Sequence, residues 1–586
     1  MQASFACHRP SMAAVLRSIA RNVGARAARA PVITRRAPSG APGQGACRRG
    51  GAVRAAADLV GADVAIGRDA FKTLDIVFYN TLSRKKEKFE TMTEGKVAMY
   101  VCGVTVYDLS HIGHARAYVA FDVLYRFLQF VGYEVDYCRN FTDIDDKIIA
   151  RANERGEDPG DLTERMIQEY LKDMEMLFCL PPTREPRATE HIDGMIKTIQ
   201  SIIDNGHAYQ AGGDVYFEVG TLPGYGRLSG RKQEDNQAGA SGRLQTEASV
   251  KRGSGDFVLW KAAKPGEPTW DSPWGPGRPG WHIECSTMIK TLMGSAIDIH
   301  GGGQDLVFPH HENEIAQSQA AACCCDKEHM HNGGVDFVRY WLHNGFVNVD
   351  NEKMSKSLGN FFTIRDIVHQ YDPVALRFFL VSTHYRQPLN YSDVGLEMAS
   401  ARAYYIYQTL DECRKALEDA GEEGVQATEA AAAATEGPGV DLLQQAVKAL
   451  ADDVSTPNVV ALFGEPLKVI NDLSPATKKN KKKADRLPTL ASLQHGLRQV
   501  LALLGLPTEA DSAGDIIARL RQSFLQRAKL TEEDIACLIE QRAEARKNKD
   551  FERGDQIRDE LAAKGVLLKD APEGTTWQPG TPAGKA

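Results

Sequence analysis

The sequence predicts an α/β protein in which a Rossmann-like nucleotide-binding domain with an insertion is followed by a helical bundle and a small C-terminal domain. Three observations predict this fold class. A strand, a loop, an amphipathic helix and a second strand follow one another from Lys96. The pattern becomes helical after Tyr391, and two helices rich in arginine and lysine follow Leu530.

The chain has 586 residues, of which 43% are hydrophobic and 25% charged. This composition provides several hydrophobic cores and excludes a single small module. No run of about eighteen apolar residues occurs, so we expect no membrane-spanning helix. The net charge of -7 gives no global sign of nucleic-acid binding, although an acidic protein can still carry a basic groove.

The first 57 residues contain ten arginines and many alanines, and no Asp or Glu precedes Asp58. This composition is typical of an organellar transit peptide, so we expect residues 1–57 to direct the protein to the chloroplast, the mitochondrion or both. A basic arm that binds nucleic acid is the alternative. The eleven cysteines lack the spacing of a disulfide framework, so reduced thiols are expected.

The first βαβ unit can be followed residue by residue. "KVAMYVCG" predicts a strand, "VTVYDLSHIGH" a loop, and the helical spacing of apolar residues from Tyr118 to Leu128 predicts a helix that stops at Gly132. "YEVDYCRNFT" predicts the next strand. The loop would therefore lie at the carboxyl end of a strand, where open α/β sheets bind ligands.

The rest of the chain divides by composition. Residues of about 160–280 predict a connective insertion with helices and a polar, glycine-rich patch. Residues 391–510 predict a helical bundle in which "EEGVQATEAAAAATEGPG" and "KKNKKKADR" are solvated loops. Residues 511–578 predict a C-terminal domain, and 579–586 a tail.

Two short stretches suggest phosphate chemistry. "SHIGHAR" places His111, Gly113 and His114 in the turn that opens a helix, where free N–H groups and imidazoles can bind a polyphosphate. "NEKMSKSLGN" carries Lys353 and Lys356, whose ammonium groups suit the charge of a departing pyrophosphate. The alternatives are that His111 and His114 are ordinary polar turn residues, and that the two lysines lie in a solvated loop.

With these two stretches, "HIGH" and "KMSKS", the sequence resembles the class I aminoacyl-tRNA synthetases. It is more narrowly similar to the cysteinyl-tRNA synthetase family through "YVCGVTVYDLSHIGHARAYVAFDV", "NFTDIDDKII", "GWHIECSTM", "IHGGGQDLVFPHHENEIAQS" and "EGTTWQ". The resemblance runs from about residue 73 to 577. It implies a catalytic domain over residues 73–390 with the catalytic residues His111, His114, Lys353 and Lys356, and an anticodon-binding C-terminal domain.

A metal site is expected in "HGGGQDLVFPHHENE". His310 and Glu314 are four residues apart and would share one helix face, while His311 is three residues from Glu314 and serves almost as well on spacing alone. The resemblance assigns His310 and adds Cys102 and Cys285. Two thiolates, an imidazole and a carboxylate together favour zinc, and a closed structural zinc site is the alternative.

The resemblance also implies the pocket that surrounds this site. ATP would contact His111, Gly113, His114, Gly301, Gly302, Gly303, Asp305 and Lys356. Substrate would contact Thr142, Trp281 and His300. Glycines permit close approach of the backbone, and the Asp305 carboxylate can accept a hydrogen bond from a ribose hydroxyl.

The reaction that the resemblance implies has two steps. L-cysteine, held as a thiolate by one zinc ion, reacts with ATP and Mg2+ to form an adenylate, and the cysteinyl group then passes to tRNA(Cys). Zinc selects the thiol over the hydroxyl of serine, so no editing site is needed. A monomer is expected. A ligase that joins cysteine to a small-molecule amine and a non-catalytic RNA-binding homologue are the alternatives.

Overall fold

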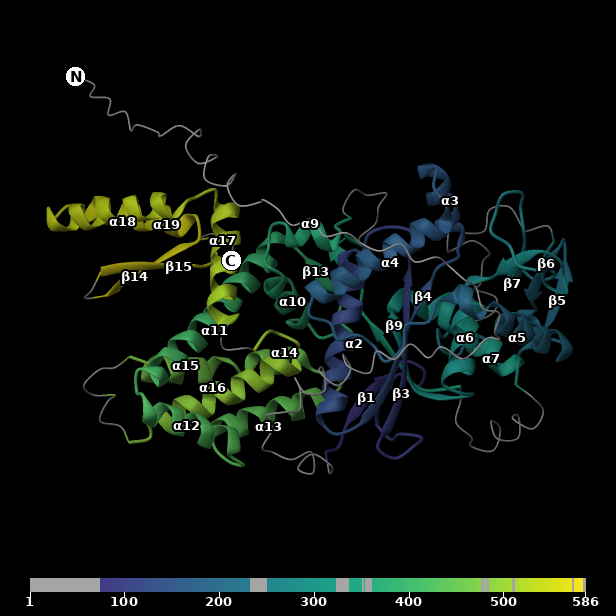
Figure 1. The fold of residues 1–586 in the computed structure, drawn as a ribbon, viewed down its shortest axis with the longest axis horizontal. Helices are drawn as coiled ribbons and strands as arrows, with labels where there is room; N and C mark the ends of the chain where they lie inside the picture. Colours follow the sequence, from purple (N-terminus) through teal and green to yellow (C-terminus); the bar gives the residue numbers. More distant parts are fainter. Residues whose placement is uncertain are drawn as a thin grey trace, which may run out of the picture. The chain divides into compact units, whose positions relative to one another are not determined.

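A parallel β-sheet forms the centre of the first domain in the computed structural model (Figure 1). The structure describes residues 74–231, 250–322, 337–349, 352–353, 361–475, 480, 484–508, 512–571 and 574–582. The sheet consists of β3 (Lys96–Thr105), β4 (Glu134–Thr142), β9 (Ile297–Gly303) and β10 (Val338–Asn344), in the order β10-β9-β3-β4. All three neighbouring pairs are parallel.

The predicted βαβ unit is confirmed. Helix α2 (Ile112–Phe130) joins β3 to β4, and Gly132 follows it with φ 106°. The apolar residues at helical spacing, from Tyr118 to Leu128, are buried. Because β4 and β9 lie on opposite sides of β3, the strand order changes direction at β3. Ligands bind at such a switch point, outside the carboxyl ends of the strands.

The insertion between β4 and β9 contains a second, antiparallel sheet that the sequence patterns did not indicate. Its order is β5-β6-β7-β8. Its strands are only three to six residues long, so they show too little alternation to be recognised. The elements of this region are α3 (Asp146–Arg155), α4 (Pro159–Met176), η2 (Ala188–His191), α5 (Ile192–Asp204), β5 (Ala208–Ala211), β6 (Asp214–Phe217), η3 (Val219–Thr221), β7 (Phe257–Ala262), β8 (Gly277–Pro279) and α6 (Trp281–Leu292).

Short elements complete the first domain around the central sheet. An antiparallel hairpin precedes the sheet, and a three-stranded sheet of order β12-β11-β13 follows β10. These elements are β1 (Val77–Asn80), β2 (Lys85–Lys88), η5 (Gln304–Leu306), η6 (Val307–His311), α7 (Glu312–Ala320), β11 (Val347–Val349), β12 (Glu352–Lys353), α9 (Ile364–Val368), α10 (Pro373–Val381) and β13 (Leu389–Tyr391).

The predicted helical bundle begins with α11 (Asp393–Glu418). The prediction that "EEGVQATEAAAAATEGPG" is a solvated loop is wrong, because residues Glu422–Ala433 form helix α12. Alanine has the highest helix propensity, and Gly424 lets this helix approach α11 so closely that a Cβ there would lie 1.9 Å from the Leu417 carbonyl oxygen. The other helices are α13 (Pro438–Ala451), α14 (Thr456–Ala461), α15 (Gly464–Leu473) and α16 (Arg486–Leu503).

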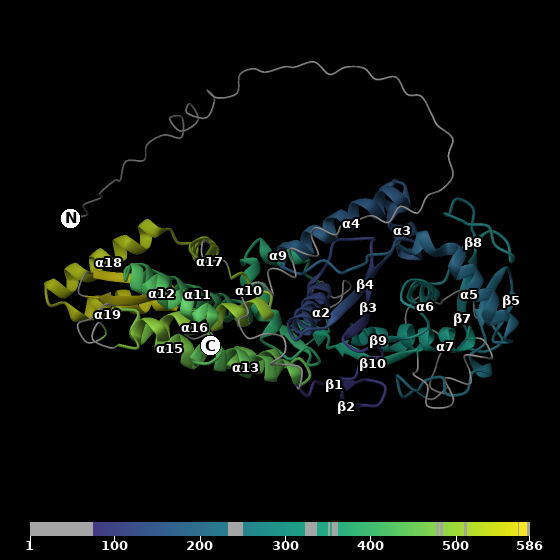
Figure 2. The same ribbon diagram turned by 60° about the horizontal axis from the view of Figure 1, so that its bottom comes forward.

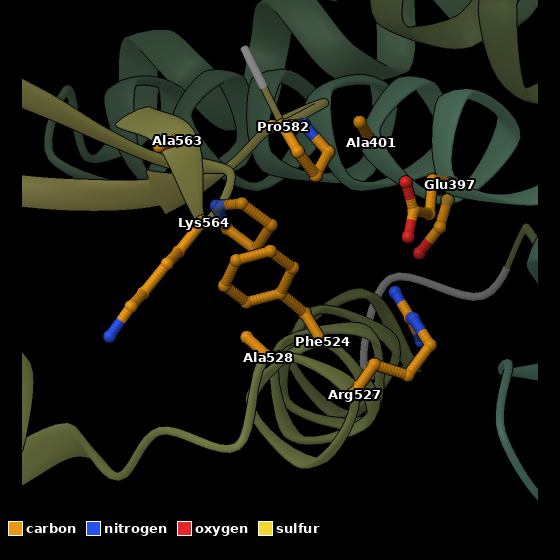
Figure 3. Close-up of a pocket in the computed structure, with 11 residues that line it drawn as sticks. Glu397, Ala401, Phe524, Arg527, Ala528, Ala563, Lys564 and Pro582 are labelled. Carbon is orange, nitrogen blue, oxygen red and sulfur yellow. The ribbon is translucent and has the colours of Figure 1, made fainter. Parts of the chain in front are cut away.

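The predicted pair of C-terminal helices is confirmed as α18 (Glu532–Lys547) and α19 (Phe551–Ala563), which lie along the hairpin of β14 (Val566–Ala571) and β15 (Gly574–Pro579) (Figure 2). Helix α17 (Ser512–Ala528) precedes them. Phe524 and Arg527 of α17 lie opposite Glu397 and Ala401 of α11 (Figure 3). These residues line a cavity of about 200 Å³.

Within the described ranges, every helix is too short or too polar to cross a bilayer. The expected transit segment 1–57, Lys356 and most of the "KMSKS" stretch lie outside the described residues, as do parts of the lysine-rich "KKNKKKADR" loop and of the tail.

Candidate active site and metal cluster

The "HIGH" turn caps helix α2. His111 is the N-cap residue, and its Nδ1 accepts a hydrogen bond from the Gly113 N–H at 3.0 Å. The Nδ1 of His114 accepts from the His111 N–H at 3.3 Å, and the two rings stack with centroids 3.7 Å apart. Because each Nδ1 accepts, the hydrogen-bond pattern assigns the ring proton to Nε2 in both residues. The turn therefore carries two imidazole N–H donors beside the N-terminus of a helix.

The segment that follows the "KMSKS" stretch is tied to this turn. The Ile112 N–H donates to the Phe362 carbonyl at 3.2 Å, and the Ile364 N–H donates to the Ser110 carbonyl at 2.9 Å. The ring of Phe361 meets the His111 ring edge to face at 4.9 Å. On the other side of the stretch, Lys353 belongs to β12, which pairs with β11. Both described flanks of the predicted lysine loop are thus anchored, one of them on the signature turn.

Four buried side chains form a cluster that could hold a metal ion: Cys102, His310, His311 and Glu314. Their ligand atoms all lie within 4.8 Å of one another. The His310 Nε2 is 3.0 Å from Glu314 Oε1, as the spacing of four predicts, and Cys102 Sγ is 3.3 Å from His311 Nε2. Three of the four predicted ligands are therefore in one cluster, and His311, which the sequence left open, is the fourth member.

Cys285, the remaining predicted ligand, lies beside this cluster on α6. Its Sγ is 3.8 Å from Cys102 Sγ and 3.5 Å from His310 Nε2. A hydrogen bond from Cys102 lowers the pKa of the Cys285 thiol to about 6, whereas burial raises that of Cys102. Five donors meet here, and their soft sulfur, imidazole and carboxylate types fit zinc.

The irregular end of β3 explains why Cys102 faces the cluster. The pairing of β3 with β4 changes register between Val101 and Val104. Gly103 lies in this bulge, so close to β4 that a Cβ there would be 1.5 Å from the Asn140 carbonyl oxygen. Bulges redirect side chains and are common next to functional sites.

A second layer of imidazoles holds the candidate ligands. The His310 Nδ1 is 2.9 Å from His282 Nδ1, and the His311 Nδ1 is 2.7 Å from His343 Nε2. Such outer partners fix ring orientation at metal sites. Neither histidine is predicted from the sequence as part of the site. His282 could have been noticed three residues before Cys285, but His343 comes from β10 and no local pattern marks it.

The predicted pocket residues take different places. Trp281 and Asp305 line a cavity of about 1020 Å³, and the Trp281 ring stacks on His310 at 4.1 Å. His300 is fully buried behind the cluster, with Nε2 2.9 Å from Glu314 Oε2. Thr142 is also buried and donates from Oγ1 to Glu284 Oε2 at 2.7 Å. These contacts suit the Trp281 ring to packing against a bound ligand, and the His300 ring to orienting the Glu314 carboxylate.

The three glycines of β9 are close to different neighbours. A Cβ at Gly301 would lie 2.3 Å from the Phe121 ring, and one at Gly302 would lie 2.9 Å from the His311 ring. At Gly303 the nearest atom is the Asp305 carboxylate, 2.4 Å away. The glycine run therefore makes room for a core aromatic ring and for the metal cluster.

In the C-terminal domain, Trp577 of "EGTTWQ" is only 9% exposed. Its Nε1 donates to Glu532 at 3.1 Å, and the Arg521 guanidinium lies 4.0 Å from its ring centroid. The Trp577 ring therefore packs within the domain, between Glu532 and Arg521.

Comparisons with known proteins agree with the motifs. Residues 88–401 match the family model "tRNA synthetases class I (C) catalytic domain", and residues 530–577 match "Cysteinyl-tRNA ligase anticodon binding domain". A cysteine–tRNA ligase of Arabidopsis thaliana, named chloroplastic/mitochondrial, is 53% identical over 87% of this chain and 87% of its own length. A cysteine–tRNA ligase of Syntrophotalea carbinolica is 48% identical over 85% of this chain and 98% of its own length.

The organellar location predicted from the N-terminal composition is confirmed by the names of the relatives in Arabidopsis thaliana, Oryza sativa and Zea mays. In fold, the chain is similar to a Mycobacterium tuberculosis methionyl-tRNA synthetase solved with methionyl-adenylate, with a TM-score of 0.51, 16% identity, and coverage of 75% of this chain and 96% of that one. Because one family model spans the signature turn and the metal cluster and the relatives match over most of their length, the chain belongs to the cysteine–tRNA ligases, a family of class I tRNA synthetases.

Proposed function

We propose that the protein activates L-cysteine with ATP and Mg2+ to cysteinyl-adenylate and transfers the cysteinyl group to tRNA(Cys) for organellar translation. The observation that carries this proposal is the buried cluster of thiol, imidazole and carboxylate groups, reached from the same strand end as the "HIGH" turn. Cys102 precedes His111 by only nine residues. The chain therefore links the metal cluster closely to the phosphate-binding groups of the "HIGH" turn.

The cluster would hold one zinc ion. Cys102, His310 and Glu314 are its expected protein ligands, with Cys285 as the fourth by family resemblance and His311 in reach of the same position. When bound, zinc supplies the Lewis acidity that lets a substrate thiol bind as a thiolate. Serine would bind weakly there, since its hydroxyl is harder and far more basic.

The protein's own residues orient the amino acid. Trp281 stacks on His310 and lines the cavity, so its ring both fixes a ligand imidazole and offers an apolar wall to a small side chain. The His300 Nε2 keeps the Glu314 carboxylate in place by a hydrogen bond with Oε2. A preorganised site of this kind positions the cysteine carboxylate for attack on the α-phosphate of ATP.

The activation step needs no protein nucleophile, because positioning and electrostatic stabilisation do most of the work in phosphoryl chemistry. His111 and His114 would donate from Nε2 to the polyphosphate, beside the α2 N-terminus and Gly113. Lys353 and Lys356 would stabilise the pyrophosphate as it departs. Gly301, Gly302, Gly303 and Asp305 would border the adenosine.

The transfer step places the 3′ end of tRNA(Cys) at the adenylate while the C-terminal domain contacts the anticodon. We assign the catalytic domain to residues 73–390, the bundle to 391–510 and the anticodon-binding domain to 511–578. A monomer suffices for this arrangement, because the candidate site draws its residues from one chain.

ATP–pyrophosphate exchange without tRNA tests the activation step. Exchange should depend on cysteine, should not be supported by serine, and should fall about 100-fold or more when His114 is replaced by alanine, the size expected for loss of a transition-state donor. His369→Ala, in a histidine just after α9, is the control and should keep full exchange. Exchange that serine supports equally well would refute the thiol-selective site.

A further inference from the structure

The loop between α10 and β13 is fastened by three separate parts of the chain. Arg116 of α2 is buried and donates to four carbonyl groups around this loop, those of Leu380, Thr383, His384 and Gln387. Gly345, between β10 and β11, donates to the Tyr385 carbonyl at 2.8 Å. A Cβ at Gly345 would lie 2.4 Å from the Gln387 carbonyl oxygen, so this contact requires glycine.

The third fastening comes from the helical bundle. Asp453, in the turn between α13 and α14, is fully buried and accepts hydrogen bonds from the Tyr79 N–H, the Tyr385 hydroxyl and the Arg386 Nε, at 2.9, 2.9 and 2.7 Å. Asp453 and Val454 have φ angles of 61° and 52°. Positive φ is costly for a β-branched residue, so these contacts must hold the turn in its conformation.

The turn thereby fixes Arg386 in a wall of the large cavity. Arg386 lines the same 1020 Å³ cavity as Trp281, and its guanidinium lies 4.3 Å from the Tyr79 ring centroid. Thr81 and His343 belong to the same wall and are joined by a 2.8 Å hydrogen bond. With Nε engaged by Asp453, the Nη groups are the donors that Arg386 can offer to a ligand.

Resting on the proposed function, we propose that Arg386 binds the phosphates of the 3′ strand of tRNA, and that Asp453 is the residue that positions it. A guanidinium stays charged and matches phosphate geometry. ATP is the other phosphate source, and Asp305 of this cavity would border its adenosine, but the histidines of the signature turn, which would bind its phosphates, are not among the residues that line the cavity. The carboxylate that holds Arg386 belongs to the bundle, which leads to the anticodon-binding domain. Of the substrates, tRNA alone extends from the active site to the anticodon-binding domain, so a phosphate-binding residue fixed by the connecting bundle suits tRNA.

The experiment measures exchange without tRNA and the salt dependence of kcat/KM for tRNA, using the full zinc-loaded chain. Arg386→Gln should leave the KM values for ATP and cysteine within about twofold. It should reduce the slope of log(kcat/KM) for tRNA against log(salt concentration) by about 0.7, the value for one contact to a single-stranded phosphate. Arg386→Lys keeps the charge and should keep the slope. Arg339→Gln is the matched control: it removes a β10 arginine that pairs with Glu90 outside the cavity lining, and should change neither quantity.

Asp453→Asn tests the positioning role. It should raise the KM for tRNA, and combining it with Arg386→Gln should add little, because both changes remove the same contact. An unchanged salt slope in Arg386→Gln would overturn the inference, and so would a raised KM for ATP, which would assign Arg386 to the nucleotide. These results are distinct from failure of the proposed function, in which the unaltered chain itself would lack cysteine-dependent exchange.

Discussion

Replacing Gly302 with alanine should weaken metal binding without disrupting the fold. The new Cβ would lie 2.9 Å from His311 Cε1 and 2.9 Å from Leu306 Cδ1. Carbon atoms normally approach to about 3.5 Å, so the ring must move by roughly 0.6 Å. His311 is fully buried between Cys102 and His343, at 3.3 and 2.7 Å, and has little room to do so.

The expected magnitudes follow from this geometry. Overpacking of a buried site costs about 1–3 kcal/mol of the free energy of unfolding. Displacing a residue at or next to a metal cluster typically lowers metal affinity about 10–100-fold. Gly302→Ala should therefore show a modest loss of stability together with a large loss of zinc affinity.

The neighbouring glycines provide matched controls. At Gly301 the added Cβ meets the buried Phe121 ring at 2.3 Å, so Gly301→Ala should lower the melting temperature most, because a core ring has to move. At Gly303 the nearest atom belongs to the exposed carboxylate of Asp305, which can rotate away. Gly303→Ala should leave both stability and zinc affinity close to those of the unaltered protein.

The assay is competition for zinc against a chelator, paired with thermal unfolding of each variant. If Gly302→Ala retained zinc as tightly as the unaltered protein, His311 would not be confined by the metal cluster. If all three variants changed only the KM for ATP, the glycine run would serve the nucleotide alone, and the reasoning from the cluster would be refuted.

Two further predictions concern the cluster and the core. Cys285→Ser should reduce zinc stoichiometry and cysteine-dependent exchange, whereas Cys138→Ser, in a buried thiol of β4, should preserve bound zinc as measured by metal analysis; full exchange by Cys285→Ser without zinc would contradict this. Asp122→Asn should lower the free energy of unfolding by about 3–5 kcal/mol in urea melts, because it leaves the buried Arg377 without its carboxylate. Burial raises the pKa of Asp122, but Arg126 and Arg377 outweigh it and hold the pKa below its usual value. The stabilisation should therefore be complete above about pH 4 and lost as the pH falls further, and a urea midpoint with the same acid dependence in Asp122→Asn would contradict this.

The sequence predicts the parts of the site that are local in the chain. The spacing of His310 and Glu314 requires only a helical turn, and the structure brings their ligand atoms to 3.0 Å. The sequence could not decide between His310 and His311, because both rings lie in the cluster. The backbone kink at Phe308 comes just before these two residues. His343 could not be predicted at all, since its contact depends on the pairing of β10 with β9.

The fold shows the same limit. The βαβ unit has long elements with clear apolar periodicity and was predicted correctly. The antiparallel sheet of the insertion has strands too short to show a period. The residues of helix α12 are mostly polar or small, a composition that predicts a loop, although its alanines favour a helix that α11 and α16 can cover.

Charging of tRNA tests the central claim most directly. Protein that lacks residues 1–57 would be loaded with zinc and mixed with ATP, Mg2+, labelled L-cysteine and organellar tRNA, and acid-precipitable label would be counted. We predict label in tRNA with cysteine and none when labelled serine replaces it. Adenylate formation that leaves tRNA unlabelled, or equal charging by serine, would contradict a zinc-dependent, thiol-selective cysteine–tRNA ligase.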